Sequence, residues 1–322
     1  MRWGLLGTSR VSRHLIPLLH QLDGHEPVAV ASRSPARAEQ FARQWNIARA
    51  LSPYEALLND REVEVVYNAL PNSLHAEWTI AALRAGKHVL CEKPLATRAA
   101  DVDAIVDAAR AAGRAATEAF MYRYHAQTAR LRSLVADRAV GDVRSVSGEF
   151  SFLLNRPADV RLESGLEGGA LWDVGCYLTS YARLIMAREP SSVWGWQEIG
   201  PSGVDLTFAG LLVFPGSYAP LDCGFRSAYR ASIEIVGTEG VLQVPNPFRP
   251  GVRERLILAR PDGAQTIEVE GRPWFADAVD EMRRLADGQP PTLPLSESRG
   301  NVATLEALYR SAREQCWVQP AC

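Results

Sequence analysis

Two lysines are the first candidates for chemistry in this chain. Of its 35 basic residues, 33 are arginine, and the two lysines, Lys87 and Lys93, lie six positions apart. Burial and neighbouring charges can make a lysine lose its proton, whereas arginine stays charged. Lys93 ends an apolar run and precedes Pro94, so its backbone leaves the predicted strand in a restrained turn. We expect chemistry at Lys93, whereas Lys87 is consistent with a codon bias toward arginine.

A second candidate pair is Asp173 and Tyr177. The two residues are four positions apart on a helix predicted from 169 to 187, so their side chains lie on the same face of that helix. Free tyrosine titrates near 10, and a lysine ammonium within about 4–6 Å lowers the phenol pKa toward neutrality. All six histidines lie within the first 125 residues, so the remainder supplies no imidazole base. We expect Tyr177 to be a general acid/base and Lys93 its tuner and a carbonyl polariser. The alternative is that Tyr177 is a core aromatic residue.

Asp173 and the glycine pair before it complete this segment. We expect the Asp173 carboxylate to bind a substrate hydroxyl, and it could also hold the Lys93 ammonium. Gly168 and Gly169 at the predicted helix start permit close approach of another backbone or a ring.

Composition excludes several classes of protein. The 322 residues suggest two domains, and a net charge of −2 with 22% charged residues argues against a nucleic-acid or anionic-membrane partner. No run of 18 apolar residues indicates a spanning helix, and no secretory leader pattern is present, so we expect a cytoplasmic protein. Five widely spaced cysteines predict neither a disulfide framework nor a thiolate metal site.

The first 120 residues alternate short apolar runs with helical patterns, which predicts a doubly wound parallel sheet, a Rossmann domain, over 1–120. The predicted strands are 3–6, 28–31, 63–70, 89–91 and 115–120, and the helices are 11–19, 36–45, 76–85 and 102–112. Ligands of such sheets bind beyond the carboxyl ends of the strands. The residues expected to bind a cofactor there include Leu70, Asn72, His75, Glu92, Lys93 and Pro94. For His75, capping of the following helix is an equal alternative.

The turn after the first strand resembles a dinucleotide phosphate loop in position. The six residues of a G-x-G-x-x-G/A motif correspond here to Gly7, Thr8, Ser9, Arg10, Val11 and Ser12. Only the first glycine is present, and Ser9 and Ser12 replace the other two. An ordinary helix cap is the alternative.

The second strand ends at Ser32, Arg33 and Ser34, with Arg37 one turn later. An NAD enzyme usually carries a carboxylate here, whereas a hydroxyl and two guanidiniums suit the 2′-phosphate of NADP. We therefore expect NADP to be preferred, with NAD also accepted. The alternative is that these residues only cap and solvate the next helix.

The second half, 121–322, has a strand-rich pattern that predicts a separate α+β domain. Strand candidates are 143–152, 193–199, 205–214, 219–226, 231–236, 254–260 and 265–270, and helical stretches at 275–287 and 297–314 close the chain. Turn signals between them indicate antiparallel pairing. Arg123 is a candidate substrate ligand because its five donors suit a polyol or carboxylate, with a structural salt bridge as the alternative; nearby His125 is the weaker candidate.

Four ordered motifs resemble the glucose–fructose oxidoreductase/inositol dehydrogenase (Gfo/Idh/MocA) family across nearly the whole chain. They are Pro-Asn-Ser-Leu-His at 71–75, the segment from 85 to 96 with Glu-Lys-Pro, Glu-Ala-Phe-Met-Tyr-Arg at 118–123, and Gly-Gly-Ala-Leu-Trp-Asp-Val-Gly-Cys-Tyr at 168–177. The resemblance implies a Rossmann domain followed by a domain with a large, mostly antiparallel sheet. It also implies that Lys93 lies beside the nicotinamide and that Pro94 follows a cis peptide.

The resemblance narrows the function. Many members carry histidine where this chain has Tyr177, and the tyrosine branch resembles dihydrodiol and xylose dehydrogenases, glucose–fructose oxidoreductase and some nucleotide-sugar ketoreductases. It implies an NAD(P)-dependent enzyme that acts on a sugar, polyol or cyclic diol, and a homodimer or dimer of dimers paired sheet to sheet. A non-catalytic regulator of the same fold and a sugar–sugar oxidoreductase with tightly held NADP are the alternatives.

Overall fold

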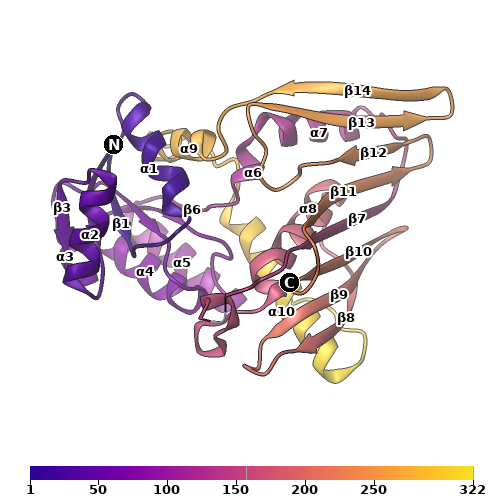
Figure 1. Cartoon of the computed structure of the whole chain (residues 1–322). Helices are drawn as coiled ribbons and strands as arrows, with labels where there is room; N and C mark the ends of the chain where they lie inside the picture. The colour runs from indigo at the N-terminus through magenta and orange to yellow at the C-terminus, as the bar shows by residue number, and fades with distance from the viewer. Residues whose placement is uncertain (157, 322) are drawn as a thin grey trace. The chain divides into compact units, whose positions relative to one another are not determined.

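The computed structural model describes residues 1–156 and 158–321 and divides the chain into two compact units (Figure 1). The first unit is Met1–Met121 together with Trp274–Ser298, and the second is Tyr122–Pro273 together with Arg299–Cys322. Each unit contains one sheet.

The first unit contains a six-stranded, wholly parallel sheet in the order β3-β2-β1-β4-β5-β6. Its strands are β1 (Arg2–Leu6), β2 (Glu26–Ala31), β3 (Arg49–Leu51), β4 (Val65–Asn68), β5 (His88–Cys91) and β6 (Ala116–Glu118). Their nearly continuous apolar runs are buried because helices cover both faces of such a sheet. The strand order reverses between β1 and β4, which is where doubly wound folds bind ligands.

Helices alternate with these strands, so the predicted Rossmann architecture is confirmed. They are α1 (Ser12–Gln21), α2 (Pro35–Trp45), α3 (Tyr54–Leu58), the 3₁₀ turn η1 (Asn72–Leu74), α4 (His75–Arg84) and α5 (Ala99–Ala112). The sequence analysis missed β3 and α3, because three- and five-residue elements are too short to show a periodic pattern.

The segment Trp274–Ser298 returns to the first unit, which the expected division into 1–120 and 121–322 did not include. It carries α9 (Ala276–Ala286), and the ring of Phe275 lies edge-on to Tyr67 with centroids 6.3 Å apart. The Thr117 hydroxyl donates to the Leu293 carbonyl at 3.3 Å. These partners are so far apart in sequence that no local pattern indicates them.

The second unit contains an eight-stranded sheet in the order β14-β13-β12-β11-β7-β10-β9-β8. Its strands are β7 (Val143–Ser151), β8 (Ser192–Ile199), β9 (Asp205–Phe214), β10 (Ser217–Gly224), β11 (Arg230–Gly237), β12 (Val241–Val244), β13 (Arg253–Arg260) and β14 (Gly263–Glu270). Neighbouring strands are antiparallel except β7 and β10, which confirms the mostly antiparallel prediction. The analysis missed the four-residue strand β12.

Besides α9, the described helical elements after residue 120 are α6 (Met121–Tyr124), α7 (Ala126–Ala136), the short turns η2 (Val160–Leu162) and η3 (Ser164–Leu166), η4 (Leu171–Gly175), α8 (Cys176–Met186) and α10 (Leu295–Glu314). Within the second unit, α8 packs on β7, and α7 packs on β13 and β14 (Figure 1). The helix predicted over 169–187 is in fact a wide π-helical turn, η4, that continues as α8. Such π-turns inside helices occur frequently at functional sites.

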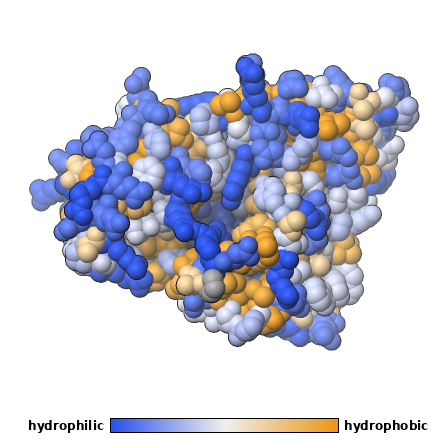
Figure 2. All heavy atoms as spheres, in the orientation of Figure 1, coloured by the Kyte–Doolittle hydropathy of each residue, from blue (hydrophilic) through white to orange (hydrophobic). Residues whose placement is uncertain are grey.

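The surface mixes polar and apolar residues. The face in view is mainly hydrophilic, with apolar residues between the polar ones (Figure 2). Large exposed apolar side chains include Trp194 and Trp196 on β8 and Tyr218 on β10. Among residues 1–156 and 158–321, none of the helices has both the length and the apolar character that crossing a bilayer requires.

Candidate active site

The carboxyl ends of the parallel strands bring most of the predicted cofactor-binding residues to one edge of the first unit. Ser32 follows β2, Gly7 follows β1, Leu70 lies beyond β4, and Lys93 lies just beyond β5. Because these strands are neighbours in the sheet, their following loops are neighbours too. The edge therefore has the arrangement that binds an extended dinucleotide.

The loop after β1 fits a bound pyrophosphate. Gly7 has φ +85°, and a Cβ there would lie 2.9 Å from the Leu70 side chain, so the glycine is required. The Ser9 hydroxyl accepts from the Val11 N–H at 3.3 Å directly before α1, and the first turn of α1 carries no acidic residue. Its backbone N–H groups and helix dipole favour an anion. An ordinary helix cap makes the same bond as Ser9, so the capping alternative agrees with the structure as well.

The loop after β2 carries the residues expected to select NADP. The buried Ser32 hydroxyl accepts from the Ser34 N–H at 3.2 Å, and the Ser34 hydroxyl caps α2 by accepting from the Arg37 N–H at 3.4 Å. The capping alternative is thus confirmed for Ser34, while the guanidiniums of Arg33 and Arg37 are exposed. Arg33 also hydrogen-bonds the hydroxyl of Tyr54, a contact that opposes the raised pKa that burial gives this phenol.

Lys93 lies in a turn that several side chains brace. The Lys93–Pro94 peptide is cis, as the family resemblance implies. One Glu92 carboxylate oxygen accepts from the Tyr67 hydroxyl at 2.6 Å, and the other accepts from the Lys93 N–H at 3.3 Å. The Leu95 N–H donates to Glu118 Oε1 at 2.9 Å. The backbone on both sides of the Lys93–Pro94 peptide is therefore held by carboxylates.

His75 has a structural contact that the sequence did not indicate. Its Nδ1 lies 2.7 Å from the Pro94 carbonyl oxygen, and its Nε2 lies 2.7 Å from the Leu70 carbonyl oxygen. The ring is buried, and desolvation lowers its pKa. The ring does not cap α4, so that alternative is wrong, and contact of His75 with a cofactor stays a prediction.

The two lysines differ in environment. The buried Lys87 ammonium donates to the carbonyls of Asp60 and Val63 at 2.7 and 2.8 Å, and burial lowers its pKa. These bonds hold the chain just before β4, so Lys87 is a structural lysine. Lys93 is half-buried at the ligand-binding edge of the sheet.

In the second unit, the glycines before η4 permit close approach as predicted. A Cβ on Gly168 would overlap the Arg161 carbonyl, and a Cβ on Gly169, at φ +122°, would overlap the Asp205 carboxylate. The Tyr309 hydroxyl would lie 2.8 Å from that Gly169 Cβ. Both a backbone and a ring therefore pack against the glycine pair.

Asp205 anchors the start of the helix that carries the predicted catalytic pair. Its carboxylate accepts from the Leu171 N–H at 2.7 Å and from the Tyr309 hydroxyl at 2.6 Å. The side chain is buried, and desolvation raises its pKa. The sequence analysis missed this residue because an aspartate at the start of a predicted strand carries no distinguishing signal.

Asp173 is paired with an arginine that the sequence analysis also missed. Arg161 Nε donates to Asp173 Oδ2 at 2.6 Å, and Arg161 Nη1 lies 3.1 Å from Asp159 Oδ1. The two carboxylates raise the pKa of the guanidinium. Arg161 lies in the irregular segment before Gly168, where no periodic pattern pointed to it.

Tyr177 lies within an aromatic cluster of the second unit and is 6% exposed. Its ring centroid is 5.6 Å from that of Phe150, 5.3 Å from that of Phe248 and 6.0 Å from that of Tyr122. This packing agrees with the core-aromatic alternative, and it also gives the phenol a fixed position. Because Lys93 belongs to the first unit, its action on Tyr177 stays a prediction.

Arg123 and His125 have protein partners in the second unit. Arg123 Nη1 donates to the Ser180 hydroxyl at 3.3 Å, so its role toward a substrate stays a prediction. The His125 Nδ1 accepts from the Gln127 N–H at 3.1 Å and caps α7, while its Nε2 lies 3.3 Å from the Arg272 carbonyl oxygen. His125 is therefore a structural residue.

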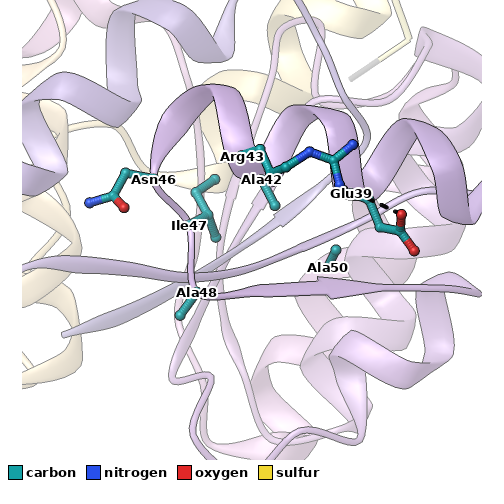
Figure 3. Close-up of a pocket in the computed structure, with 7 residues that line it drawn as sticks. All are labelled: Glu39, Ala42, Arg43, Asn46, Ile47, Ala48 and Ala50. Carbon is teal, nitrogen blue, oxygen red and sulfur yellow. Dashed lines mark ion pairs between the residues drawn. The ribbon is translucent and has the colours of Figure 1, made fainter.

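A separate surface pocket lies between α2 and β3 in the first unit (Figure 3). A 3.8 Å ion pair joins Arg43 and Glu39 beside it. Its lining residues are Glu39, Ala42, Arg43, Asn46, Ile47, Ala48 and Ala50. None of the predicted site residues is among them, so this pocket is distinct from the ligand-binding edge.

Two family models match the chain. Residues 1–120 match an oxidoreductase family with an NAD-binding Rossmann fold, and residues 128–243 match the GFO/IDH/MocA C-terminal domain. Both matches agree with the family that the four sequence motifs resemble.

Characterised relatives and solved structures agree with the family models. The chain is 36% identical in sequence to D-xylose 1-dehydrogenase (NADP(+)) 2 of Haloferax volcanii, and the alignment covers 97% of each protein. Trans-1,2-dihydrobenzene-1,2-diol dehydrogenase of Xenopus laevis is 34% identical over 76% of this chain and 75% of the relative. A 3-ketoreductase of Actinomadura kijaniata, solved with NADP and TDP-benzene, superposes with a TM-score of 0.91 at 28% identity over 97% of each chain. This chain belongs to the Gfo/Idh/MocA family of NAD(P)-dependent oxidoreductases.

Proposed function

We propose that this protein is an NADP-preferring dehydrogenase or reductase that acts on a secondary alcohol or ketone of a sugar, polyol or cyclic diol. The observation that carries the proposal is the common sheet edge of the first unit. It combines a glycine loop before a helix whose first turn carries no acidic residue, exposed arginines after β2, and a half-buried lysine after β5. The named activities of the xylose and dihydrodiol dehydrogenases support the substrate class.

The residues of the chain divide the chemistry between them. A bound nicotinamide supplies or accepts the hydride. Tyr177 transfers the proton at the substrate oxygen, and Lys93 polarises that oxygen and favours the ionised phenol. Asp173 binds a second substrate hydroxyl, and Arg161 holds its carboxylate in one orientation. Arg123 supplies further donors to the substrate.

NADP preference follows from charge at the end of β2. The cofactor 2′-phosphate is an anion, and Arg33 and Arg37 offer charge-assisted hydrogen bonds to it. The segment from 32 to 37 contains no carboxylate that would repel the phosphate or accept from a ribose 2′-hydroxyl. No group in this segment repels NAD, but NAD lacks the 2′-phosphate that the two arginines would bind. We therefore expect NAD to bind more weakly than NADP without being excluded.

Absorbance at 340 nm tests the proposal with a panel of aldoses, inositols and dihydrodiols, each supplied with NADP or NAD. We expect turnover with at least one sugar-like substrate and a higher kcat/KM with NADP. Tyr177→Phe should lower turnover about 10²-fold or more while NADP binding, followed by fluorescence titration, is unchanged. Normal turnover by Tyr177→Phe would remove the phenol from the mechanism.

The same panel separates the alternatives. Nucleotide binding without hydride transfer to any compound would favour a non-catalytic regulator. Bound NADP that survives extensive dialysis, together with hydride exchange between two sugars, would favour a sugar–sugar oxidoreductase. Either result would replace the dehydrogenase proposal.

We further propose a homodimer in which the outward face of β8, β9 and β10 pairs with the same face of a second copy. Trp194 is 38% exposed, and both Trp196 and Tyr218 are 50% exposed, while the alternate residues Val193 and Gly195 are buried. Leu211 joins Trp194 to Pro220 in one cross-strand row.

Light scattering coupled to size-exclusion chromatography tests this surface. We expect the wild type to elute at twice the mass of the 35.3 kDa chain or a multiple of that, and Trp196→Glu to shift toward the monomer. Val252→Glu changes an exposed apolar side chain before β13, away from β8, β9 and β10 in the strand order, and serves as the control. A monomeric wild type would contradict the proposal.

A further inference from the structure

His75 links two loops at the ligand-binding edge of the first unit. Its ring lies between the Leu70 carbonyl, in the loop after β4, and the Pro94 carbonyl, in the turn after β5, with both nitrogen–oxygen distances 2.7 Å. The two strands are adjacent, and Asn68 at the end of β4 pairs with Cys91 at the end of β5. The ring therefore spans the two loops where they leave neighbouring strands.

The backbone of His75 is itself held in place. Asn68 Nδ2 donates to the His75 carbonyl and to the Thr79 hydroxyl, each at 3.1 Å. The Asn68 Oδ1 accepts from the Leu70 N–H at 3.3 Å. Both the main chain at the start of α4 and the ring are thus tied to the end of β4, so a displacement of His75 moves the Leu70 loop with it.

An imidazole suits this position for a geometric reason. Its two nitrogens lie on opposite sides of a rigid ring, so two carbonyls on different loops can be reached at once. Both partners are acceptors, so a neutral ring donates one of these bonds and a doubly protonated ring donates both. Burial has the largest effect and lowers the His75 pKa, as does the Lys93 charge, while the Pro94 and Leu70 carbonyls raise it. The Lys93 ammonium is thus close enough to act on the ring electrostatically.

We propose that His75 is the positioning residue for Lys93, holding the Pro94 backbone against the Leu70 loop so that the ammonium points to the reacting oxygen. The proposal rests on the role of Lys93 in the proposed function. It differs from a cofactor contact, since both ring nitrogens face backbone carbonyl oxygens of the protein.

Two substitutions at His75 test the proposal by activity. His75→Phe keeps a ring without hydrogen-bonding atoms, and misplacement of a catalytic group by about 1 Å costs about 10²-fold in rate. We expect kcat to fall about 10- to 100-fold while the Kd for NADP changes by less than about threefold. His75→Gln retains amide donors and should recover part of the lost kcat.

His25→Phe is the matched control in the same unit. His25 is also buried, and its Nδ1 accepts from Trp3 Nε1 at 3.0 Å, so the substitution likewise removes a buried imidazole and its hydrogen bond. We expect this variant to lower the Tm and leave kcat unchanged. If His75→Phe and His25→Phe lower Tm, NADP affinity and kcat to the same extent, His75 is only structural and the proposal is overturned.

The scarcity of lysine gives a readout that needs no turnover. Lysine labelled with ¹³C yields side-chain NMR signals from only Lys87 and Lys93, and Lys87→Arg assigns them. We expect His75→Phe to shift the Lys93 Cε signal and its titration, and to leave Lys87 unchanged. Unchanged Lys93 signals would overturn the positioning role. A shifted Lys93 signal in a protein that transfers no hydride to any substrate would support the positioning and refute the proposed function.

Discussion

Replacement of Asp205 by alanine should destabilise the second unit because two buried donors lose their acceptor. The Leu171 N–H and the Tyr309 hydroxyl both donate to this carboxylate, and the side chain is 2% exposed. Hydrogen bonds to charged groups contribute about 1.5–3 kcal/mol each, so the two together are worth about 3–6 kcal/mol. Burial raises the Asp205 pKa, which means that desolvation of the carboxylate offsets part of this gain. We therefore expect the free energy of unfolding to fall by about 3 kcal/mol in the Asp205→Ala variant.

Asp205→Asn is the matched control. Its amide oxygen can accept from the Leu171 N–H, and its NH₂ group can donate to the Tyr309 oxygen, so each partner keeps one hydrogen bond to residue 205. We expect the free energy of unfolding of this variant to fall by about 1 kcal/mol or less.

Urea unfolding at pH 7, followed by far-UV circular dichroism and by tryptophan fluorescence, measures both variants. The two probes are needed because the chain has two compact units that need not unfold together. Because Leu171 begins the turn that carries Asp173, kcat should fall more for the alanine variant than for the asparagine variant. Equal stabilities of Asp205→Ala and Asp205→Asn would refute the reasoning that unsatisfied donors decide the loss.

Three further perturbations test other parts of the first unit. Gly7→Ala should weaken NADP binding in a fluorescence titration, because the new Cβ meets Leu70 2.9 Å away; Gly86→Ala, also at positive φ but in open space, should lower only the Tm. Arg33→Ala should raise the KM for NADP about 10- to 100-fold and leave that for NAD unchanged, and equal effects on both would contradict a 2′-phosphate contact. Burial lowers the pKa of His25 to about 4 from its ordinary 6.5, so the unfolded chain binds a proton first as pH falls. The free energy of unfolding measured by urea titration should therefore fall by about 3 kcal/mol between pH 6.5 and 4. The His25→Asn variant should lack this part of the pH dependence.

The strands and turns illustrate what local patterns predict well. The apolar runs of the first 120 residues and the turn signals after β9, β11 and β13 predicted both sheets, because burial and turn geometry depend on neighbouring residues. The short elements β3, α3 and β12 escaped because they contain too few residues to show a period. The wide turn η4 escaped because a π-helical turn and an α-helix share one apolar pattern.

The place of the candidate site in the sheet was predicted, but the side chains that support it were not. Gly7, Ser32 and Lys93 could be placed at one edge because the carboxyl ends of parallel strands always coincide. His125 was considered a substrate contact but caps α7 instead. The cap escaped prediction because the predicted elements did not include a helix after His125, so no helix start marked it.

The sequence by itself determined the fold class, the family motifs and the placement of Lys93 and the glycine loop, because these depend on residues close together in the chain. Only the tertiary structure decided which side chains hold the residues predicted to be catalytic. Arg161 meets Asp173 across 12 positions, His75 meets Pro94 across 19, and Asp205 meets Leu171 across 34. Such pairs form when separate segments pack together, and hydrogen bonding between them depends on side-chain orientation in three dimensions, which no local pattern encodes.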